Sequence, residues 1–170
     1  MDFAAPGPLP AVDEVFVALG TTIKVAGSQE AFRAIDFDAV LAVARAARAA
    51  GATKLGVVSA MGASARSSVF YNRVKGEMED AVSSLGYTTV IIARPSFLAG
   101  DRTALDQPER SGEGLALLVS RTFKALIPAN YRSIPADRVA AALRQAVKAG
   151  RPGRQVLLSG VLQNGGQAHA

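Results

Sequence analysis

The chain has 170 residues, of which 49% are hydrophobic and 19% are charged, and this predicts one folded domain of 170 residues rather than a disordered or fibrous protein. Cysteine is absent, which excludes disulfides, thiol nucleophiles and cysteine-ligated metals. The single histidine, His169, stands next to the C-terminus, so a serine–histidine–aspartate triad and a histidine metal site are also excluded. Proton transfer must therefore rest on tyrosine, lysine, serine or carboxylates, and no metal site is expected.

The net charge of +5 admits anionic partners, but the basic residues are scattered and gather mainly near the ends of predicted helices, where cations are favoured. Aromatic residues make up 6% of the chain and tryptophan is absent, so a platform for stacking nucleic-acid bases is missing. The sequence has neither an apolar run of membrane-spanning length nor a signal peptide. We therefore expect no nucleic-acid partner, no membrane partner and a cytoplasmic location.

The first predicted strand is the unbroken apolar run 15–19, which follows a proline-rich loop over 4–10 and stops at Gly20. Ser28 can cap a helix that runs to about Ala50, with Gly51 beyond its end. The next elements are a strand over 55–59, a helix over 68–84, a strand over 88–93, a long loop over 96–112, a helix near 115–125, a helix from Pro135 to Gly150 and a strand over 156–159. Residues 163–170 are predicted as a disordered tail.

Alternating strands and helices predict an α/β fold, a parallel sheet of about four strands with right-handed crossovers and flanking helices. In such sheets ligands bind beyond the carboxyl ends of the strands. The loops that follow Leu19, Ser59 and Ala93 are therefore the places to look for a site.

Tyr71 and Lys75 stand four residues apart in a predicted helix, so they share one face. A nearby ammonium favours the phenolate and lowers the pKa of a tyrosine, which makes the pair suited to acid–base work. Ser59 ends the preceding strand, where its hydroxyl can bind the same carbonyl oxygen as the tyrosine. The alternative interpretation of the Tyr71/Lys75 spacing alone is an amphipathic surface helix.

These three residues resemble the Ser–Tyr–Lys set of the short-chain dehydrogenase/reductase superfamily. The resemblance is closest to its small atypical members, the bacterial semialdehyde-dehydrogenase-like and sugar-epimerase-like proteins and the Tat-interacting oxidoreductases. It covers roughly 13–147 and also rests on the segments 18–22, 27–33, 94–100 and 131–135. The resemblance implies a Rossmann fold with Tyr71 as acid/base, Lys75 as ribose ligand and tuner of Tyr71, and Ser59 as the residue that orients the substrate carbonyl.

The same resemblance implies that NADP or NAD is the cofactor. Gly20 and Thr21 match the loop that passes the adenine ribose and the nicotinamide, and Pro95 and Ser96 match the loop that meets the nicotinamide amide. Each glycine or proline has a plainer interpretation, since Gly20 can simply be a strand-end turn and Pro95 can simply stop a strand. Asp137 matches a position in the last predicted helix, where we interpret it as a first-turn carboxylate rather than a catalytic group.

The chain departs from the family because no G-x-G-x-x-G follows a strand. Compared with family members, the N-terminal glycine-rich half, the first βαβαβ unit that grips the pyrophosphate, is missing. We therefore expect the strand over 15–19 to be an uncovered sheet edge and the chain to self-associate through it.

The leading hypothesis is an NAD(P)-dependent oxidoreductase that exchanges hydride with a small carbonyl or alcohol, a substrate that the sequence does not name. The alternative is a non-catalytic nucleotide-binding or protein-interaction module, because the catalytic residues are present without most of the cofactor grip. Turnover with a nicotinamide cofactor and a carbonyl panel distinguishes the two hypotheses.

Overall fold

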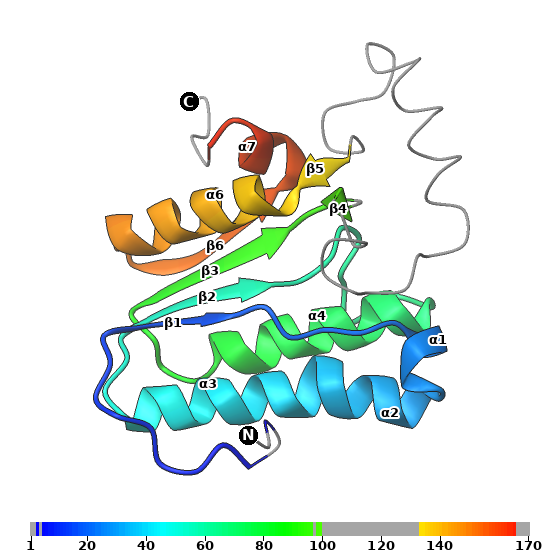
Figure 1. The fold of residues 1–170 in the computed structure, drawn as a ribbon, viewed down its shortest axis with the longest axis horizontal. Coiled ribbons are helices and arrows are strands. Elements are labelled where there is room, and N and C mark those ends of the chain that lie inside the picture. The colour runs from blue at the N-terminus through cyan, green and yellow to red at the C-terminus, as the bar shows by residue number, and fades with distance from the viewer. Residues whose placement is uncertain (1–2, 4, 97, 100–132, 166–170) are drawn as a thin grey trace.

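Four parallel strands form the central sheet of this computed structural model, which describes residues 3, 5–96, 98–99 and 133–165 (Figure 1). The strands are β1 (Glu14–Val17), β2 (Lys54–Val58), β3 (Thr89–Arg94) and β6 (Gly153–Leu158), in the spatial order β1-β2-β3-β6. All three neighbouring pairs are parallel. The predicted fold class is therefore confirmed, while the predicted helix near 115–125 lies outside the described residues.

Helices cover both faces of the sheet. On one face α3 (Val40–Ala49) and α4 (Phe70–Ser83) pack on alternate side chains of the strands, among them Leu55, Val57 and Ile92. On the other face α6 (Ala136–Ala149) packs on Ile91 and Ala93. Both faces of the two inner strands are thus buried, which explains their unbroken apolarity.

Gly56 in β2 shows how closely α6 approaches the sheet. A Cβ added there would lie 2.9 Å from a side-chain carbon of Phe16 and 2.9 Å from one of Val147. Strand β2 therefore needs a glycine at this position because its neighbours already fill the space of a side chain.

The single helix predicted from Ser28 to Ala50 is three successive helical segments, α2 (Gln29–Arg33), the π-helical η1 (Ala34–Ala39) and α3. The Ser28 hydroxyl accepts a hydrogen bond from the Ala31 amide at 3.0 Å, as the capping prediction requires. A short helix that the sequence did not predict, α1 (Ile23–Ala26), precedes it and ends at Gly27 with φ of 89°. A π-helical turn is uncommon and is frequent at functional sites.

Two short strands, β4 (Leu98–Ala99) and β5 (Ile134–Pro135), pair in parallel beyond the end of β3. After β6 the chain forms α7 (Ser159–Gln163), so Gln163 is helical where a tail was predicted. Residues 166–170, the rest of that predicted tail, lie outside the described residues.

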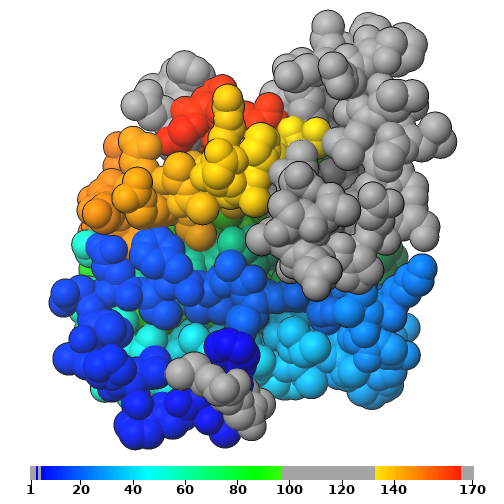
Figure 2. Space-filling model, in the orientation of Figure 1, coloured from blue at the N-terminus to red at the C-terminus, as the bar shows by residue number. Residues whose placement is uncertain are grey.

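Strands β1 and β6 are the two edges of the four-stranded sheet. On β1 the side chain of Phe16 is 44% exposed, because α6 reaches over β2 and β3 but not over β1. Figure 2 shows the N-terminal residues at the surface as a blue band below α6. On β6 the exposed side chains Val156 and Leu158 lie beyond the helices of the other face.

Candidate functional site

The carboxyl ends of β2 and β3 are tied together where the sequence predicted a site. The Ser59 amide donates to the Ala93 carbonyl at 2.8 Å, and the Met61 amide donates to the Pro95 carbonyl at 3.1 Å. These bonds continue the pairing of the two strands into their loops. They fix Ser59 at the rim of the sheet, where parallel α/β folds bind ligands.

The Ser59 side chain is 6% exposed, and its hydroxyl lacks a hydrogen-bond partner among the described residues. A buried hydroxyl without a partner carries a free-energy cost of about 1–3 kcal/mol, so buried hydroxyls are almost always paired. An unpaired one at a strand end is suited to bind a group that comes from outside the chain.

Tyr71 and Lys75 lie one turn apart at the start of α4, as the sequence predicted. The ring of Tyr71 packs against Phe32 of α2, with 5.3 Å between ring centroids and 39° between the planes. Tyr71 is half-buried, whereas Lys75 is only 4% exposed. A buried lysine needs a partner for its charge.

That partner is Asp36 in η1, a residue that the sequence analysis missed. The Lys75 Nζ lies 2.7 Å from Oδ1 of Asp36, and Oδ2 of Asp36 accepts a hydrogen bond from the Thr21 amide at 2.8 Å. Asp36 is fully buried. Its position in the sequence held a signal, because it stands on the same helical stripe as the buried apolar residues Phe32 and Val40.

Gly20 leaves room beside this ion pair. A Cβ at residue 20 would lie 3.2 Å from Oδ1 of Asp36 and 3.6 Å from Nζ of Lys75. A side chain at residue 20 would therefore press on the carboxylate of Asp36, and a glycine avoids this contact.

Two other predicted cofactor residues, Pro95 and Ser96, follow β3. Pro95 is buried, and the Ser96 hydroxyl lies 3.0 Å from the hydroxyl of Ser159 at the start of α7. They follow the strand end that the Met61 amide ties to the loop after Ser59. Asp137 is exposed in the first turn of α6, away from the buried pair.

Tyr87, the other tyrosine among the described residues, has a structural role. The hydroxyl of Tyr87 donates to the Ala44 carbonyl at 2.6 Å, and burial raises the pKa of Tyr87 to about 12. A phenol with that pKa does not exchange protons readily at neutral pH. Tyr71 is therefore the better candidate, and Tyr131 lies outside the described residues.

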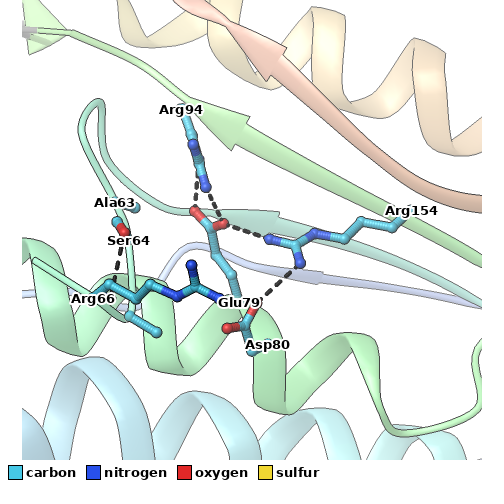
Figure 3. Close-up of a pocket in the computed structure, with 9 residues that line it drawn as sticks. Ala63, Ser64, Arg66, Glu79, Asp80, Arg94 and Arg154 are labelled. Atoms are coloured by element: carbon cyan, nitrogen blue, oxygen red, sulfur yellow. Dashed lines mark hydrogen bonds and ion pairs between the residues drawn. The ribbon is translucent and has the colours of Figure 1, made fainter.

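A second buried ion cluster lies one turn further along α4 (Figure 3). The carboxylate of Glu79, fully buried, accepts two hydrogen bonds from Arg94, at 2.9 and 2.6 Å, and one from Arg154 at 2.9 Å. Arg154 also bonds Asp80 at 3.0 Å. The bonds to Glu79 raise the pKa of Arg94 above its ordinary value. The cluster borders a cavity of about 490 Å³ that Arg66 and the 63–65 segment also line.

Within the described part of the chain, acidic and histidine side chains do not form a group able to hold a metal ion. The described helices are all too short or too polar to cross a membrane.

No family model matches the chain. Among curated proteins, it is 41% identical over 95 residues to "Protein fmp52, mitochondrial" of Emericella nidulans, a match that covers 55% of this chain and 41% of that protein. It is 42% identical over 87 residues to "Protein FMP52-1, mitochondrial" of Scheffersomyces stipitis, covering 51% and 38%. The matching protein of Aspergillus niger is 36% identical over 117 residues, covering 69% and 50%. The matched part of the chain thus spans about two fifths to one half of the length of these relatives.

Solved structures show the same fold. RMD from Pseudomonas aeruginosa, complexed with NADPH, superposes with a TM-score of 0.59 at 16% identity, over 88% of this chain and 61% of that one. The Bordetella bronchiseptica enzyme WbmG, in complex with NAD, superposes with a TM-score of 0.58 at 16% identity, over 86% and 50%. The Rossmann-like fold is therefore shown, and both of these neighbours hold a nicotinamide dinucleotide.

The names of the relatives correct one expectation from the sequence. A cytoplasmic location was expected because cysteine and a signal peptide are absent, but these curated relatives are named as mitochondrial proteins. The expectation was wrong in its reasoning as well, because neither absence distinguishes the cytoplasm from other reducing compartments.

Proposed function

We propose that the chain carries the catalytic part of a nicotinamide-dinucleotide-dependent oxidoreductase of the atypical short-chain dehydrogenase/reductase type. The observation that carries the proposal is the buried hydroxyl of Ser59, which lacks a partner among the described residues and lies at the carboxyl end of β2. The tyrosine–lysine turn that begins α4, with its buried and ion-paired lysine, supports it. Two fold neighbours that hold NADPH and NAD support this choice of ligand. The substrate class is a small carbonyl compound or the corresponding alcohol.

In this mechanism Tyr71 is the proton donor for carbonyl reduction. As negative charge develops on the carbonyl oxygen, the phenol O–H transfers its proton to that oxygen and becomes a phenolate. The hydroxyl of Ser59 donates a hydrogen bond to the same oxygen and holds it in place. A reduced nicotinamide, when bound, supplies the hydride.

Lys75 has two roles in this proposal. Its ammonium stabilises the phenolate that Tyr71 becomes, since an opposite charge nearby favours the charged form. In the proposal it also donates hydrogen bonds to the ribose hydroxyls of the cofactor. We assign Gly20 and Thr21 to the nucleotide side of the site and Pro95 and Ser96 to the nicotinamide side.

The choice between NADP and NAD is left to the experiment, because one fold neighbour holds NADPH and the other holds NAD. Nicotinamide fluorescence of NADPH and NADH, titrated with the protein, measures binding of each. Turnover of a carbonyl panel, followed by loss of nicotinamide absorbance, measures activity. Tyr71→Phe is expected to lower the turnover rate at least about 100-fold and to change the dinucleotide affinity by less than about threefold.

Arg45→Ala, at an exposed position on α3, serves as the control for general charge effects. Binding without turnover would favour the alternative of a non-catalytic nucleotide-binding module. Absence of binding by both dinucleotides would contradict the proposal for this chain.

We also propose self-association through β1. Its outer edge lacks a strand partner among the described residues, and Phe16 exposes an apolar ring beside it. Unpaired apolar edges recruit other strands.

A further inference from the structure

Lys75 is one helical turn from Tyr71 and is ion-paired with Asp36, and the two neighbours have opposite consequences for the tyrosine. One turn before it on α4 is Tyr71, whose phenolate the ammonium stabilises. Its ion-pair partner is Asp36, with 2.7 Å between the Lys75 nitrogen and the carboxylate oxygen. At this distance the carboxylate offsets much of the positive potential that the ammonium exerts on its surroundings.

The placement of Asp36 is held by the fold. Both carboxylate oxygens are engaged, one by Lys75 and the other by the Thr21 amide, and the side chain is fully buried. Asp36 lies in the π-helical turn η1, which joins α2 to α3. The contacts therefore join η1, the loop after β1 and α4 at one point, and a rotation of the Asp36 side chain would leave Lys75 buried without a counter-ion.

We propose that Asp36 is a positioning residue that holds Lys75 beside Tyr71 and sets how readily Tyr71 gives up its proton. This inference rests on the proposed function for its use in catalysis, but its physical content concerns this chain alone. With Asp36 ionised, loss of the Tyr71 proton changes the net charge of the three groups from zero to minus one. Without the Asp36 charge, the same loss changes it from plus one to zero.

The second change is easier in a partly buried site, since charge imbalance is costly where water is scarce. The surroundings of the two side chains also differ. Tyr71 is half-buried, so its phenolate keeps some hydration, while Lys75 is almost fully buried and needs an anion beside it. In an Asp36→Asn variant, the Tyr71 phenolate takes the place of that anion.

The other charged groups that the structure describes on α1, α2, η1 and the start of α4 are engaged elsewhere or exposed. On α2 and α4, Arg33 and Glu77 pair with each other near the surface. Arg73 donates to the carbonyls of Ser67 and Ser68, away from Lys75. Asp38 in η1, Glu30 in α2 and Lys24 in α1 are exposed to solvent, which screens them.

The consequence for the proposed reaction is a preference for one direction at neutral pH. A tyrosine that keeps its proton is ready to act as an acid in carbonyl reduction. A tyrosine that loses it near neutral pH is ready to act as a base in alcohol oxidation. Asp36 therefore poises the site for reduction.

The test is a titration of Tyr71 that needs no substrate. Tyrosinate absorbance is followed from pH 6 to 12 in the full chain, and the curve of Tyr71→Phe is subtracted to leave the Tyr71 contribution. Asp36→Asn is expected to lower the apparent pKa of Tyr71 by about one unit, and Lys75→Met to raise it by about one unit or more. Asp38→Asn, an exposed aspartate two residues away in η1, is the matched control and is expected to leave it unchanged.

An unchanged or raised Tyr71 pKa in Asp36→Asn would overturn the proposal. If that variant does not fold, the comparison of Lys75→Met with the Asp36→Asn/Lys75→Met double variant carries the test, because removing the carboxylate must still lower the Tyr71 pKa. The titration is independent of cofactor. A shift as expected without dinucleotide binding would retain this inference and reject the proposed function, whereas binding without the shift would do the reverse.

Discussion

Helix α4 carries two buried ion clusters one turn apart, and they are built differently. At residue 79 the fully buried carboxylate receives three hydrogen bonds from two arginines, so its bonding capacity is largely used within the chain. At residue 75 the ammonium has one carboxylate partner among the described residues, Asp36. Both clusters join α4 to other elements, but the carboxylate of Glu79 is largely saturated, whereas the single ion pair of Lys75 leaves ammonium hydrogens that a ligand can accept.

The difference teaches how to separate a structural ion cluster from a functional one. Removing one partner of a buried, saturated cluster leaves an uncompensated charge and destabilises the fold. A cluster with spare donors at the carboxyl edge of a parallel sheet retains its binding capacity for something else. We therefore expect mutation of Glu79 mainly to lower the stability of the fold and mutation of Lys75 mainly to lower its affinity for a ligand.

Glu79→Gln is expected to have the largest effect on stability. It removes the charge that Arg94 and Arg154 share, and the free energy of unfolding should fall by about 3 kcal/mol. Urea denaturation measures the loss. Glu77→Gln, two residues away in a partly exposed pair with Arg33, is the control and should cost less than about 1 kcal/mol. Equal losses in the two variants would show that Glu79 is not a structural centre.

Gly76→Ala tests the segment between the clusters. A Cβ there would lie 2.1 Å from the Ala65 amide nitrogen, so the loop after β2 must move away from α4. Overpacking of this kind costs about 1–3 kcal/mol, and thermal or urea unfolding should show it. A variant as stable as the wild type would mean that this loop is loosely held and that the wall of the cavity beside Glu79 is not fixed.

Tyr87 provides the structural counterpart of Tyr71. Its folded pKa of about 12 lies above the unfolded value of about 10, so the unfolded chain loses this proton first as pH rises. The stability from Tyr87 is fully present below pH 10 and is lost between about pH 10 and 12, by about 2 kcal/mol. Unfolding free energies across this range should fall less steeply in Tyr87→Phe. If the unfolding free energies of the wild type and Tyr87→Phe fall equally steeply with pH, the raised pKa of Tyr87 would be contradicted.

Gly20→Ala probes the surroundings of the Asp36–Lys75 ion pair. The added methyl group would lie 3.2 Å from Oδ1 of Asp36, so the carboxylate must shift slightly, and stability should fall by about 1 kcal/mol. Dinucleotide affinity should fall by about tenfold, which corresponds to about 1.4 kcal/mol. Nicotinamide fluorescence measures this. Unchanged affinity would place the ligand elsewhere.

Phe16→Ser sharpens the contrast between the covered and uncovered parts of the sheet. It removes an exposed apolar ring at the β1 edge, so self-association should weaken several-fold while the core is left intact. Sedimentation velocity over a concentration series measures the change. A wild-type chain that sediments as a single monomer at all concentrations would reject self-association through β1.

The sequence was sufficient for those features that depend on periodicity and on strand-end position. Unbroken apolar runs predicted the buried parallel strands, and the four-residue spacing placed Tyr71 and Lys75 on one helical face. It was insufficient where long-range contacts decide. Asp36 and Lys75 are 39 positions apart, and only the packing of η1 on α4 brings them together. The π-helical turn also escaped prediction, since Ala34–Ala39 carries an ordinary helical pattern.

The claim that the Lys75 cluster binds a ligand while the Glu79 cluster stabilises the fold is tested most directly by dinucleotide affinity, measured for two variants in the same buffer. The Asp36→Asn/Lys75→Met double variant removes a buried ion pair as a unit, which avoids leaving a single unpaired charge. We expect this variant to fold and to bind NADPH and NADH at least tenfold more weakly than the wild type. We expect Glu79→Gln, measured where it is still folded, to bind them like the wild type. Wild-type binding by the double variant, or loss of binding confined to Glu79→Gln, would contradict the account.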